Sequence, residues 1–551
     1  MTDLAPTTVR AVPGEMQPWT DLGPQPGPVR GAAVRAWLED VLPTGGRWLV
    51  VGPHDPELLR GLVTRADSVT ALLRSPSDAD AVREAVPEGL DLVVGALDGV
   101  PETEGPFDVV LATDGLDRVL TPDSEDLSWT ERLARVSALA GPDAVLVLGL
   151  ANEFSLSTVL DARVARDRHG DEEWRPVHSD RRRPCSPAQL VAAVGATGRS
   201  VASLWATYGP EARPGLVASV DATDAALADG FVTTMASAAS RTTTAPLLAL
   251  PDEALVSAAR AGALSTVADG FLVVCGRTAA TTATAYGSAG DASWTGRLAP
   301  SEDGPRWTVT APGGSATEFV DAPTVESELR DLAEREDVPA FRAYAGRLGQ
   351  WVGSRGSGPA LALDRLVRDG EDGFVEVLPR SDEAADVEPP QALAAGWFRF
   401  QDRLLHEHRR HPWPPWVLGE DLTAIWSSMS GVTATVEVLE SARGFATETA
   451  EPRPEIVDVR TARADVEEAV KQLHEAHGHI AGLERTIGFR DKQLLTREEK
   501  IRKLHSDLQK VERIRNHPAY QVVRKAAKVR DPRKFAVAVK KRAGKELRKR
   551  R

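Results

Sequence analysis

Short apolar runs alternate with helix-period segments over roughly the first 220 residues. The apolar runs, typical of buried strands, fall at residues 48–51, 68–73, 90–94, 107–112 and 144–148. The segments with apolar residues at helical spacing fall at residues 29–42, 57–63, 78–86 and 129–139. This alternation is typical of a parallel, doubly wound sheet. We therefore predict an α/β, Rossmann-like domain over residues 29–220, after an irregular, proline-rich lead-in (1–28) that drapes over it through Trp19.

The middle of the chain, residues 221–440, has a different pattern. A strong strand is expected at 270–275, followed by short strands with turn residues and by helices. The helices are expected at residues 251–261, 322–332, 338–352, 394–408 and 421–429. Residues 361–377 resemble a hairpin around Gly370 to Gly373. These features predict a second, α+β domain, followed by a polar linker at 441–461.

A heptad pattern extends over residues 462–515. Position a holds Val466, Leu473, Ile480, Ile487, Leu494, Ile501 and Leu508. Position d holds Ala469, Ala476, Leu483, Arg490, Arg497, Leu504 and Val511. Seven heptads in register predict a coiled coil over 466–511, on the order of 70 Å long, with a second copy as the simplest partner. Dimer and trimer both stay open, and a single amphipathic helix is the alternative.

Charge separates the carboxyl-terminal tail (516–551) from the rest of the chain. From Arg513 to Arg551 there are 16 basic residues against two acidic ones, a net charge of +14. The whole chain carries −14, so the remainder carries −28. Basic helices with an apolar stripe suit an anionic membrane surface, and phosphate makes nucleic acid the rival ligand. Because the body is acidic and shows no aromatic stacking motif, we expect the membrane at 513–551.

Composition excludes several classes of protein. The two cysteines, Cys185 and Cys275, rule out a disulfide framework and a cysteine-rich metal site. No apolar run reaches the roughly 18 residues of a membrane span, and the amino terminus lacks a signal-like segment. We therefore expect a cytoplasmic protein, peripheral at the inner face of the plasma membrane.

The first strand ends in Gly52, and a tight turn leads from there into a helix. In open α/β sheets a cofactor lies at the carboxyl end of such a strand, where glycine lets the backbone approach it. The turn reads Gly52-Pro53-His54-Asp55-Pro56. One glycine after a strand is a weak signal, because any α/β domain has such turns.

Three segments together resemble class I S-adenosylmethionine-dependent methyltransferases. They are the Gly52 turn, the fourth-strand segment from Phe107 to Val119, and the loop-and-strand segment from Leu139 to Leu148. The resemblance covers roughly residues 30–220 and implies S-adenosylmethionine as the cofactor. Its implied binding residues are Gly52, Pro53, His54 and Asp55 at the methionine part, Leu97 and Asp98 near the adenine, and Asp114 at the pocket mouth.

The chain also departs from that family. The family has several glycines in the first turn, whereas two prolines here remove backbone donors. The family has an acid after the second strand to bind the ribose hydroxyls, whereas this place reads Leu72-Leu73-Arg74. These departures leave two alternatives open, a retained cofactor site and a degenerate one.

Other polar residues are weaker candidates. Asp114, His54 and His178 are candidate bases for a methyl transfer to a hydroxyl. The run Arg181-Arg-Arg183 indicates either an anionic acceptor site or a solvated loop. His406, His408 and His411 lie close together, but no complete ligand set accompanies them, so no metal site is predicted.

Two further resemblances concern the middle domain. Residues 361–377 are faintly similar to the catalytic segment of small-molecule kinases, yet no Asn or Asp-Phe-Gly equivalent follows, which would make the lobe a pseudokinase. Asp364, Asp369 and Asp372 are therefore interpreted as turn and surface carboxylates. The segment His411-Pro-Trp-Pro-Pro-Trp416 is similar to one in high-GC bacterial methyltransferase-like proteins encoded with surface-polysaccharide enzymes.

Two hypotheses follow from the sequence. The first is a methyltransferase-like enzyme that modifies a lipid-linked or growing surface glycan at the membrane. The second is a catalytically inactive coiled-coil scaffold for glycan-synthesis enzymes. An open polar pocket beside Gly52 would favour the first, and side chains that fill it would favour the second.

Overall fold

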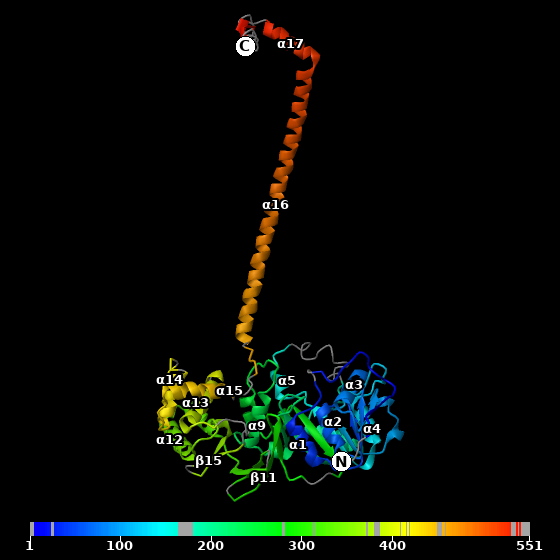
Figure 1. Ribbon diagram of the computed structural model, residues 1–551, viewed down its shortest axis with the longest axis vertical. Helices are drawn as coiled ribbons and strands as arrows, with labels where there is room; N and C mark the ends of the chain where they lie inside the picture. The colour runs from blue at the N-terminus through cyan, green and yellow to red at the C-terminus, as the bar shows by residue number, and fades with distance from the viewer. Residues whose placement is uncertain are drawn as a thin grey trace, which may run out of the picture. The chain divides into compact units, whose positions relative to one another are not determined.

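The computed structural model describes residues 5–23, 27–163, 180–277, 281–302, 304–311, 314–370, 373–378, 386–407, 409–414, 416–417, 419–448, 454–457, 459–529, 536–537 and 539–541. The chain forms two compact units, Met1–Val457 and Asp458–Arg551. Figure 1 shows the layered first unit and the single long helix of the second.

A 13-stranded sheet organises the first unit, in the order β1-β4-β3-β2-β5-β6-β9-β7-β8-β10-β11-β12-β13. The parallel part comprises β1 (Thr8–Ala11), β2 (Arg47–Val51), β3 (Ser68–Leu73), β4 (Leu90–Val94), β5 (Phe107–Ala112) and β6 (Ala140–Ala151). The antiparallel part comprises β7 (Val201–Tyr208), β8 (Leu216–Ser219), β9 (Gly270–Cys275), β10 (Ala285–Ala289), β11 (Ala292–Ala299), β12 (Arg306–Thr310) and β13 (Ala316–Val320). All five strands predicted in the first 150 residues are confirmed.

Helices cover both faces of this sheet because each face is apolar. One core joins α1 (Ala32–Val41), α2 (Pro56–Val63) and α3 (Pro76–Ala85) to the sheet through Trp37 and Trp48, both fully buried. The other face is covered by α4 (Trp129–Leu139), α7 (Pro187–Ala196), α9 (Phe231–Ser240) and α10 (Asp252–Arg260). Short helices complete the unit: η1 (Leu97–Gly99), η2 (Glu102–Glu104), α5 (Leu156–Leu160), α8 (Val220–Asp224) and η4 (Ser265–Val267).

The sheet does not stop at residue 220, where we expected a domain boundary. The predicted strand at 270–275 is confirmed as β9, but it lies between β6 and β7 and runs antiparallel to both. Strands β10 to β13 then extend the same sheet. We predicted a separate domain here because the local pattern of a sequence does not reveal which strands pair with one another.

A helical part follows the sheet within the same unit. It contains α11 (Val325–Glu334), α12 (Val338–Arg355), α13 (Pro389–His406), α14 (Glu420–Met429), α15 (Val436–Glu448), the short helix η5 (Leu363–Arg365) and the hairpin β14 (Leu366–Asp369)–β15 (Gly373–Glu376). Its core is aromatic: Phe341 contacts Trp397, Phe400, Trp413 and Trp426, at ring-centroid distances of 5.0–6.3 Å. The predicted hairpin is confirmed, whereas α15 occupies the start of the segment expected to be a linker.

The second unit is built from α16 (Val459–Asn516) and α17 (Pro518–Val529), shown in orange to red in Figure 1. The helix predicted over 462–515 is confirmed, and it ends where Pro518 follows. No described helix of the chain is long and apolar enough to cross a membrane.

The amino terminus gives one correction and one confirmation. The lead-in contains a strand, β1, which pairs in parallel with β4 at the sheet edge. The expected draping through Trp19 is confirmed, since this ring lies against Arg74, directly after β3.

Candidate functional site

The carboxyl ends of β2, β3, β4 and β5 define the candidate site, called here the carboxyl edge. Strands β3 and β4 lie on one side of β2, while β5 and β6 lie on the other. A ligand crevice is expected where the strand order reverses in this way. The residues that follow these strands are Gly52, Arg74, Gly95 and Thr113-Asp114.

The Gly52 turn has the backbone geometry that the sequence led us to expect. Gly52 adopts φ 84°, a conformation that favours glycine, and its N–H donates to the Leu72 carbonyl at 3.0 Å. Asp55 caps α2 by accepting a hydrogen bond from the Glu57 N–H at 2.9 Å. Pro53 is buried in the same turn. The Gly52 N–H and the Asp55 side chain are therefore hydrogen-bonded within the fold.

His54 is buried behind that turn, with 1% of its surface exposed. Its Nδ1 lies 3.1 Å from the Gly52 carbonyl oxygen, and its Nε2 lies 2.7 Å from Thr113 Oγ1. Because a carbonyl can only accept, Nδ1 carries the proton, and Nε2 accepts from the Thr113 hydroxyl. Burial lowers the pKa of His54 to about 4. The imidazole is neutral and fully bonded, so it is not placed to take a proton from a substrate.

Asp114 is also buried and already bound. Its Oδ2 accepts from Arg118 Nε at 2.8 Å, and its Oδ1 accepts from Arg118 Nη2 and from the Val29 N–H at 3.3 Å. Burial raises the pKa of Asp114 to about 6, against the opposing effect of Arg118. Arg118 in turn donates to the carbonyls of Asp21 and Gly27 at 3.2 and 3.0 Å. Asp114 thus binds Val29 directly and the lead-in through Arg118.

The amino-terminal segment, residues 12–23 and 27–30, crosses the ends of β3 and β4. The Val12 N–H donates to the Val94 carbonyl at 2.8 Å, and the Met16 N–H donates to the Arg74 carbonyl at 2.7 Å. The Ala96 N–H donates to the Pro13 carbonyl at 3.1 Å. A Cβ added at Gly95 would lie 2.5 Å from the Val12 carbonyl oxygen, so the contact is close.

Arg74 stands where the resembled family has a ribose-binding acid. It forms a buried, bidentate ion pair with Asp21 and donates to the Leu120 carbonyl at 2.9 Å. The Trp19 ring stacks against its guanidinium, 5.3 Å from centroid to Cζ. The sequence showed that an acid was missing here, but it gave no local signal that Asp21, 53 residues away, would pair with Arg74.

Leu97 and Asp98, expected near an adenine, are likewise engaged. The Leu97 N–H donates to the Val119 carbonyl at 2.8 Å, and the side chain is fully buried. Asp98 accepts from Ser124 Oγ at 2.7 Å and from the Glu125 N–H at 3.2 Å. In this conformation the polar side chains expected to bind S-adenosylmethionine are engaged within the fold, Asp114 by Arg118 and Asp98 by Ser124 and Glu125.

The remaining candidates lie apart from this edge or outside the described residues. His178, with the segment from Trp174, falls within 164–179 and is not described. The Arg183 side chain is 3% exposed and lies between Asp117 and Glu153, at 3.4 and 3.2 Å. It is a buried ion-pair residue, neither a free anion site nor part of a solvated loop, while Arg181 and Arg182 are exposed.

The carboxylates of the kinase-like segment need one correction. Asp364 is buried and paired with Arg403 at 2.8 Å, so it is not the surface carboxylate that we expected. Asp369 is exposed at the hairpin, and Asp372 lies outside the described residues. Among the described residues, no group of three or more His, Cys, Asp or Glu side chains could hold a metal ion.

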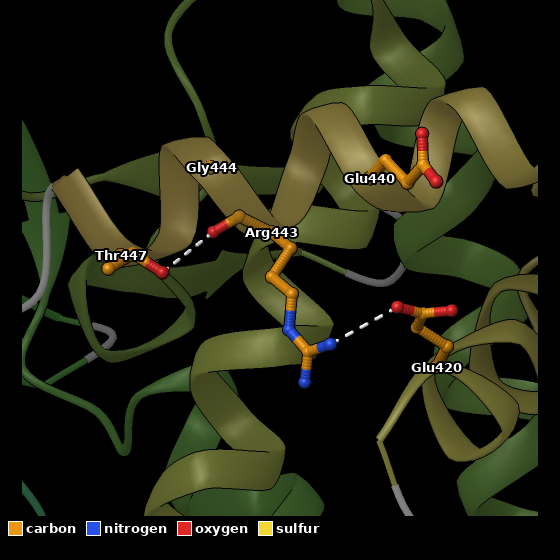
Figure 2. Close-up of a pocket in the computed structure, with 5 residues that line it drawn as sticks. All are labelled: Glu420, Glu440, Arg443, Gly444 and Thr447. Atoms are coloured by element: carbon orange, nitrogen blue, oxygen red, sulfur yellow. Dashed lines mark hydrogen bonds and ion pairs between the residues drawn. The ribbon is translucent and has the colours of Figure 1, made fainter.

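A hollow of about 460 Å³ lies between α14 and α15. It is lined by Glu420, Glu440, Arg443, Gly444 and Thr447. Figure 2 shows Arg443 reaching from α15 to Glu420, with which it pairs at 3.1 Å. Both side chains are about half exposed, and the Thr447 hydroxyl donates to the Arg443 carbonyl at 2.9 Å.

Comparison with known proteins finds no matching family model and no matching curated protein. The chain is similar in structure to solved methyltransferases. With the N-methyltransferase NodS of Bradyrhizobium japonicum, bound to S-adenosylhomocysteine, it shares 14% identity and a TM-score of 0.18 over 22% of this chain and 59% of that one.

With the 1,6-didemethyltoxoflavin-N1-methyltransferase of Burkholderia thailandensis, also bound to S-adenosylhomocysteine, it shares 18% identity and a TM-score of 0.21 over 31% of this chain and 65% of that one. With an S-adenosylmethionine-dependent methyltransferase of Thermotoga maritima it shares 11% identity and a TM-score of 0.27 over 44% of this chain and 87% of that one. The chain thus spans less than two thirds of the first two proteins.

Proposed function

We propose that this chain is a methyltransferase-fold assembly protein whose cofactor crevice is closed by its own amino-terminal segment. The observation that carries the proposal is the buried Arg74–Asp21 pair, which occupies the place of the ribose-binding acid. The hydrogen bonds of His54 and Asp114 support the proposal, since the polar atoms of both described candidate bases are already bonded inside the fold.

The second candidate is an S-adenosylmethionine-dependent methyltransferase that opens this segment before it binds the cofactor. S-adenosylmethionine is the cofactor that the sequence resemblance implies, and two of the similar structures hold its demethylated product. The Gly52 turn favours this candidate, because it keeps the glycine and the positive φ that let a backbone approach a ligand closely. The acceptor would be a hydroxyl of a surface glycan or a lipid-linked intermediate, as the segment 411–416 suggests by resemblance.

In such an assembly protein, the first unit and the two helices of the second unit would provide the binding surfaces. Helix α16 would join copies of the chain. Helix α17 carries Arg524 and Lys525 beside exposed Tyr520, Val522 and Val523. This combination suits the anionic inner face of a membrane, where glycan-synthesis enzymes would be gathered. Nucleic acid is the less favoured ligand because the rest of the chain is acidic.

Titration calorimetry of S-adenosylmethionine and S-adenosylhomocysteine into the full chain tests the proposal. We expect no heat and no thermal shift at millimolar ligand. Micromolar binding that is lost in Gly52→Trp would overturn the proposal and establish the second candidate, since a tryptophan side chain would block close approach to this turn.

Sedimentation with vesicles tests the tail separately. The full chain should bind vesicles that contain anionic lipid and should release them as salt rises, because the attraction is electrostatic. Equal binding to neutral vesicles, or none to either, would remove the membrane from the proposal. A duplex DNA competitor that strips the chain from the vesicles would favour nucleic acid instead.

A further inference from the structure

Helix α16 presents an apolar stripe with nothing packed on it in the described part of the second unit. Nine large apolar side chains at the a and d positions are at least half exposed. They are Leu473, Ile480, Leu483, Ile487, Leu494, Ile501, Leu504, Leu508 and Val511. Burial of such a stripe is what stabilises a coiled coil, so the stripe needs a partner of matching period.

Two arginines interrupt the stripe at successive d positions. Arg490 and Arg497 would lie in the seam of a coiled coil, where an unpaired charge is costly. Each is followed directly by an acid at position e, Asp491 and Glu498. Glu498 lies 3.5 Å from Arg502 on the same helix, and that pair is largely exposed. Within the described length of α16, no ion pair holds Arg490 or Arg497.

The geometry of parallel helices brings these charges together. In a parallel two-stranded coil, a d side chain packs into a hole that the partner's d and e residues help to form. Arg490 would then meet the partner's Asp491, and Arg497 would meet the partner's Glu498. Each arginine layer would contain two arginines and two carboxylates, so its net charge would be zero.

An antiparallel partner would create the opposite situation. The e positions of the two helices would then face each other, and they hold Glu484, Asp491, Glu498 and Glu512 but no Lys or Arg. Like charges set directly opposite disfavour that arrangement. The parallel arrangement has one unfavourable pair, Asp507 with the partner's Glu512, and Asp507 already has Lys510 on its own helix at 3.3 Å.

We propose that α16 binds the same helix of a second copy in parallel and in register, and that interchain Arg490–Asp491 and Arg497–Glu498 pairs select this orientation. The inference rests on the assembly role proposed above and deepens it. A parallel pair places both basic tails at the same end of the rod. Two tails on one rod would bind an anionic surface more tightly than one, because the second contact forms at high effective concentration.

Disulfide trapping in the full chain tests the orientation. The exposed Cys185 is first replaced by Ser, and buried Cys275 is kept. Cysteine is then introduced at one d position near either end, by Ala476→Cys or by Val511→Cys. We expect each variant to cross-link to itself under mild oxidation. A chain that is dimeric by light scattering, yet cross-links in neither variant, would overturn the parallel arrangement, and a monomeric chain would overturn the second copy as partner.

Charge reversal tests the selecting pairs. Asp491→Lys with Glu498→Lys leaves the arginines without counter-charges. We expect the dissociation constant of the dimer to rise by about tenfold or more. The matched control is Glu475→Lys with Glu499→Lys, which makes the same change of charge at the outward positions c and f. Equal weakening by both pairs of substitutions would overturn the role of Asp491 and Glu498. Calorimetry with S-adenosylmethionine is independent of these results, so failure of this inference and failure of the closed crevice are distinguishable.

Discussion

Arg74 and Asp21 form a bidentate ion pair at the carboxyl edge of the sheet, with Nε–Oδ2 and Nη2–Oδ1 distances of 2.7 Å each. Their side chains are 3% and 5% exposed. The pair fastens the amino-terminal segment across the crevice, since the Asp21 N–H also donates to Asp78 at 2.7 Å and the Asp21 carbonyl accepts from Arg118. A buried, doubly bonded pair of this kind is strongly coupled to the fold around it.

Substitution of Asp21 should therefore be costly. Asp21→Asn leaves the Arg74 guanidinium buried without its counter-charge, and we expect a loss of about 3 to 5 kcal/mol in the free energy of unfolding. Urea unfolding followed by tryptophan fluorescence measures this loss. The control is Asp80→Asn, since Asp80 pairs with Arg83 on the surface, at 68% and 52% exposure, where less than about 1 kcal/mol is at stake. Similar losses in both variants would contradict the anchoring role of Asp21.

Gly99→Ala should loosen the amino-terminal segment without disturbing the sheet. A Cβ at Gly99 would overlap the Pro13 carbonyl oxygen, and because that atom is backbone, the segment must move. We expect faster hydrogen exchange at residues 12–22 and unchanged exchange in β2 and β5. Gly195→Ala is the control, because nothing lies within 4 Å of its added Cβ in α7, and alanine should add about 1 kcal/mol there. Unchanged exchange at 12–22 in Gly99→Ala would show that the contact does not hold the segment.

His54 should make the protein sensitive to acid. Burial lowers its pKa from 6.5 to about 4, so the folded state holds the neutral form and the unfolded state takes up the proton first. The stability that His54 contributes is therefore complete above pH 6.5 and is lost as the pH falls from 6.5 towards 4, by about 3 kcal/mol in all. The free energy of unfolding is measured across this range for the wild type and for His54→Gln. As the pH falls, the wild type should lose stability relative to His54→Gln, which has no imidazole to protonate. Parallel curves would mean that His54 titrates normally.

Arg403 should hold the helical part of the first unit together. It lies 2.8 Å from Asp364 and 3.1 Å from Glu326, and both carboxylates are buried. Burial alone would raise the pKa of Asp364, but Arg403, with smaller contributions from Arg365 and Arg241, lowers that pKa. Arg403→Met removes this compensation, and we expect a loss of about 3 to 5 kcal/mol at pH 8, as measured by urea unfolding.

The same substitution should cost less in mild acid. Burial raises the pKa of Glu326 to about 7, so this side chain is increasingly neutral below that pH, and a neutral acid needs the arginine less. The matched control is Arg410→Met, because Arg410 pairs with Glu336 on the surface, at 75% and 49% exposure. A loss in Arg403→Met that equals the control at pH 8 would contradict this role.

Local pattern was sufficient for the elements of the parallel sheet. The runs at 48–51 and 107–112 become β2 and β5 because a buried strand needs an unbroken apolar stretch, which is visible in the sequence. The Gly52 turn was predictable from the glycine itself, since only glycine adopts its backbone angle readily. The long helix α16 also follows from its heptads, whose period is a property of the chain alone.

The tertiary structure alone decided what fills the crevice. The sequence showed that Arg74 replaces an acid, but its partner Asp21 lies 53 residues earlier, in a proline-rich stretch without periodicity. The insertion of β9 between β6 and β7 was equally invisible, because strand pairing depends on which apolar edges meet in space. The sequence by itself thus determined the five strands from β2 to β6 and the heptad stripe, whose signals are local and periodic. The contacts of Asp21 with Arg74 and Arg118 at the carboxyl edge depend on groups that only folding brings together.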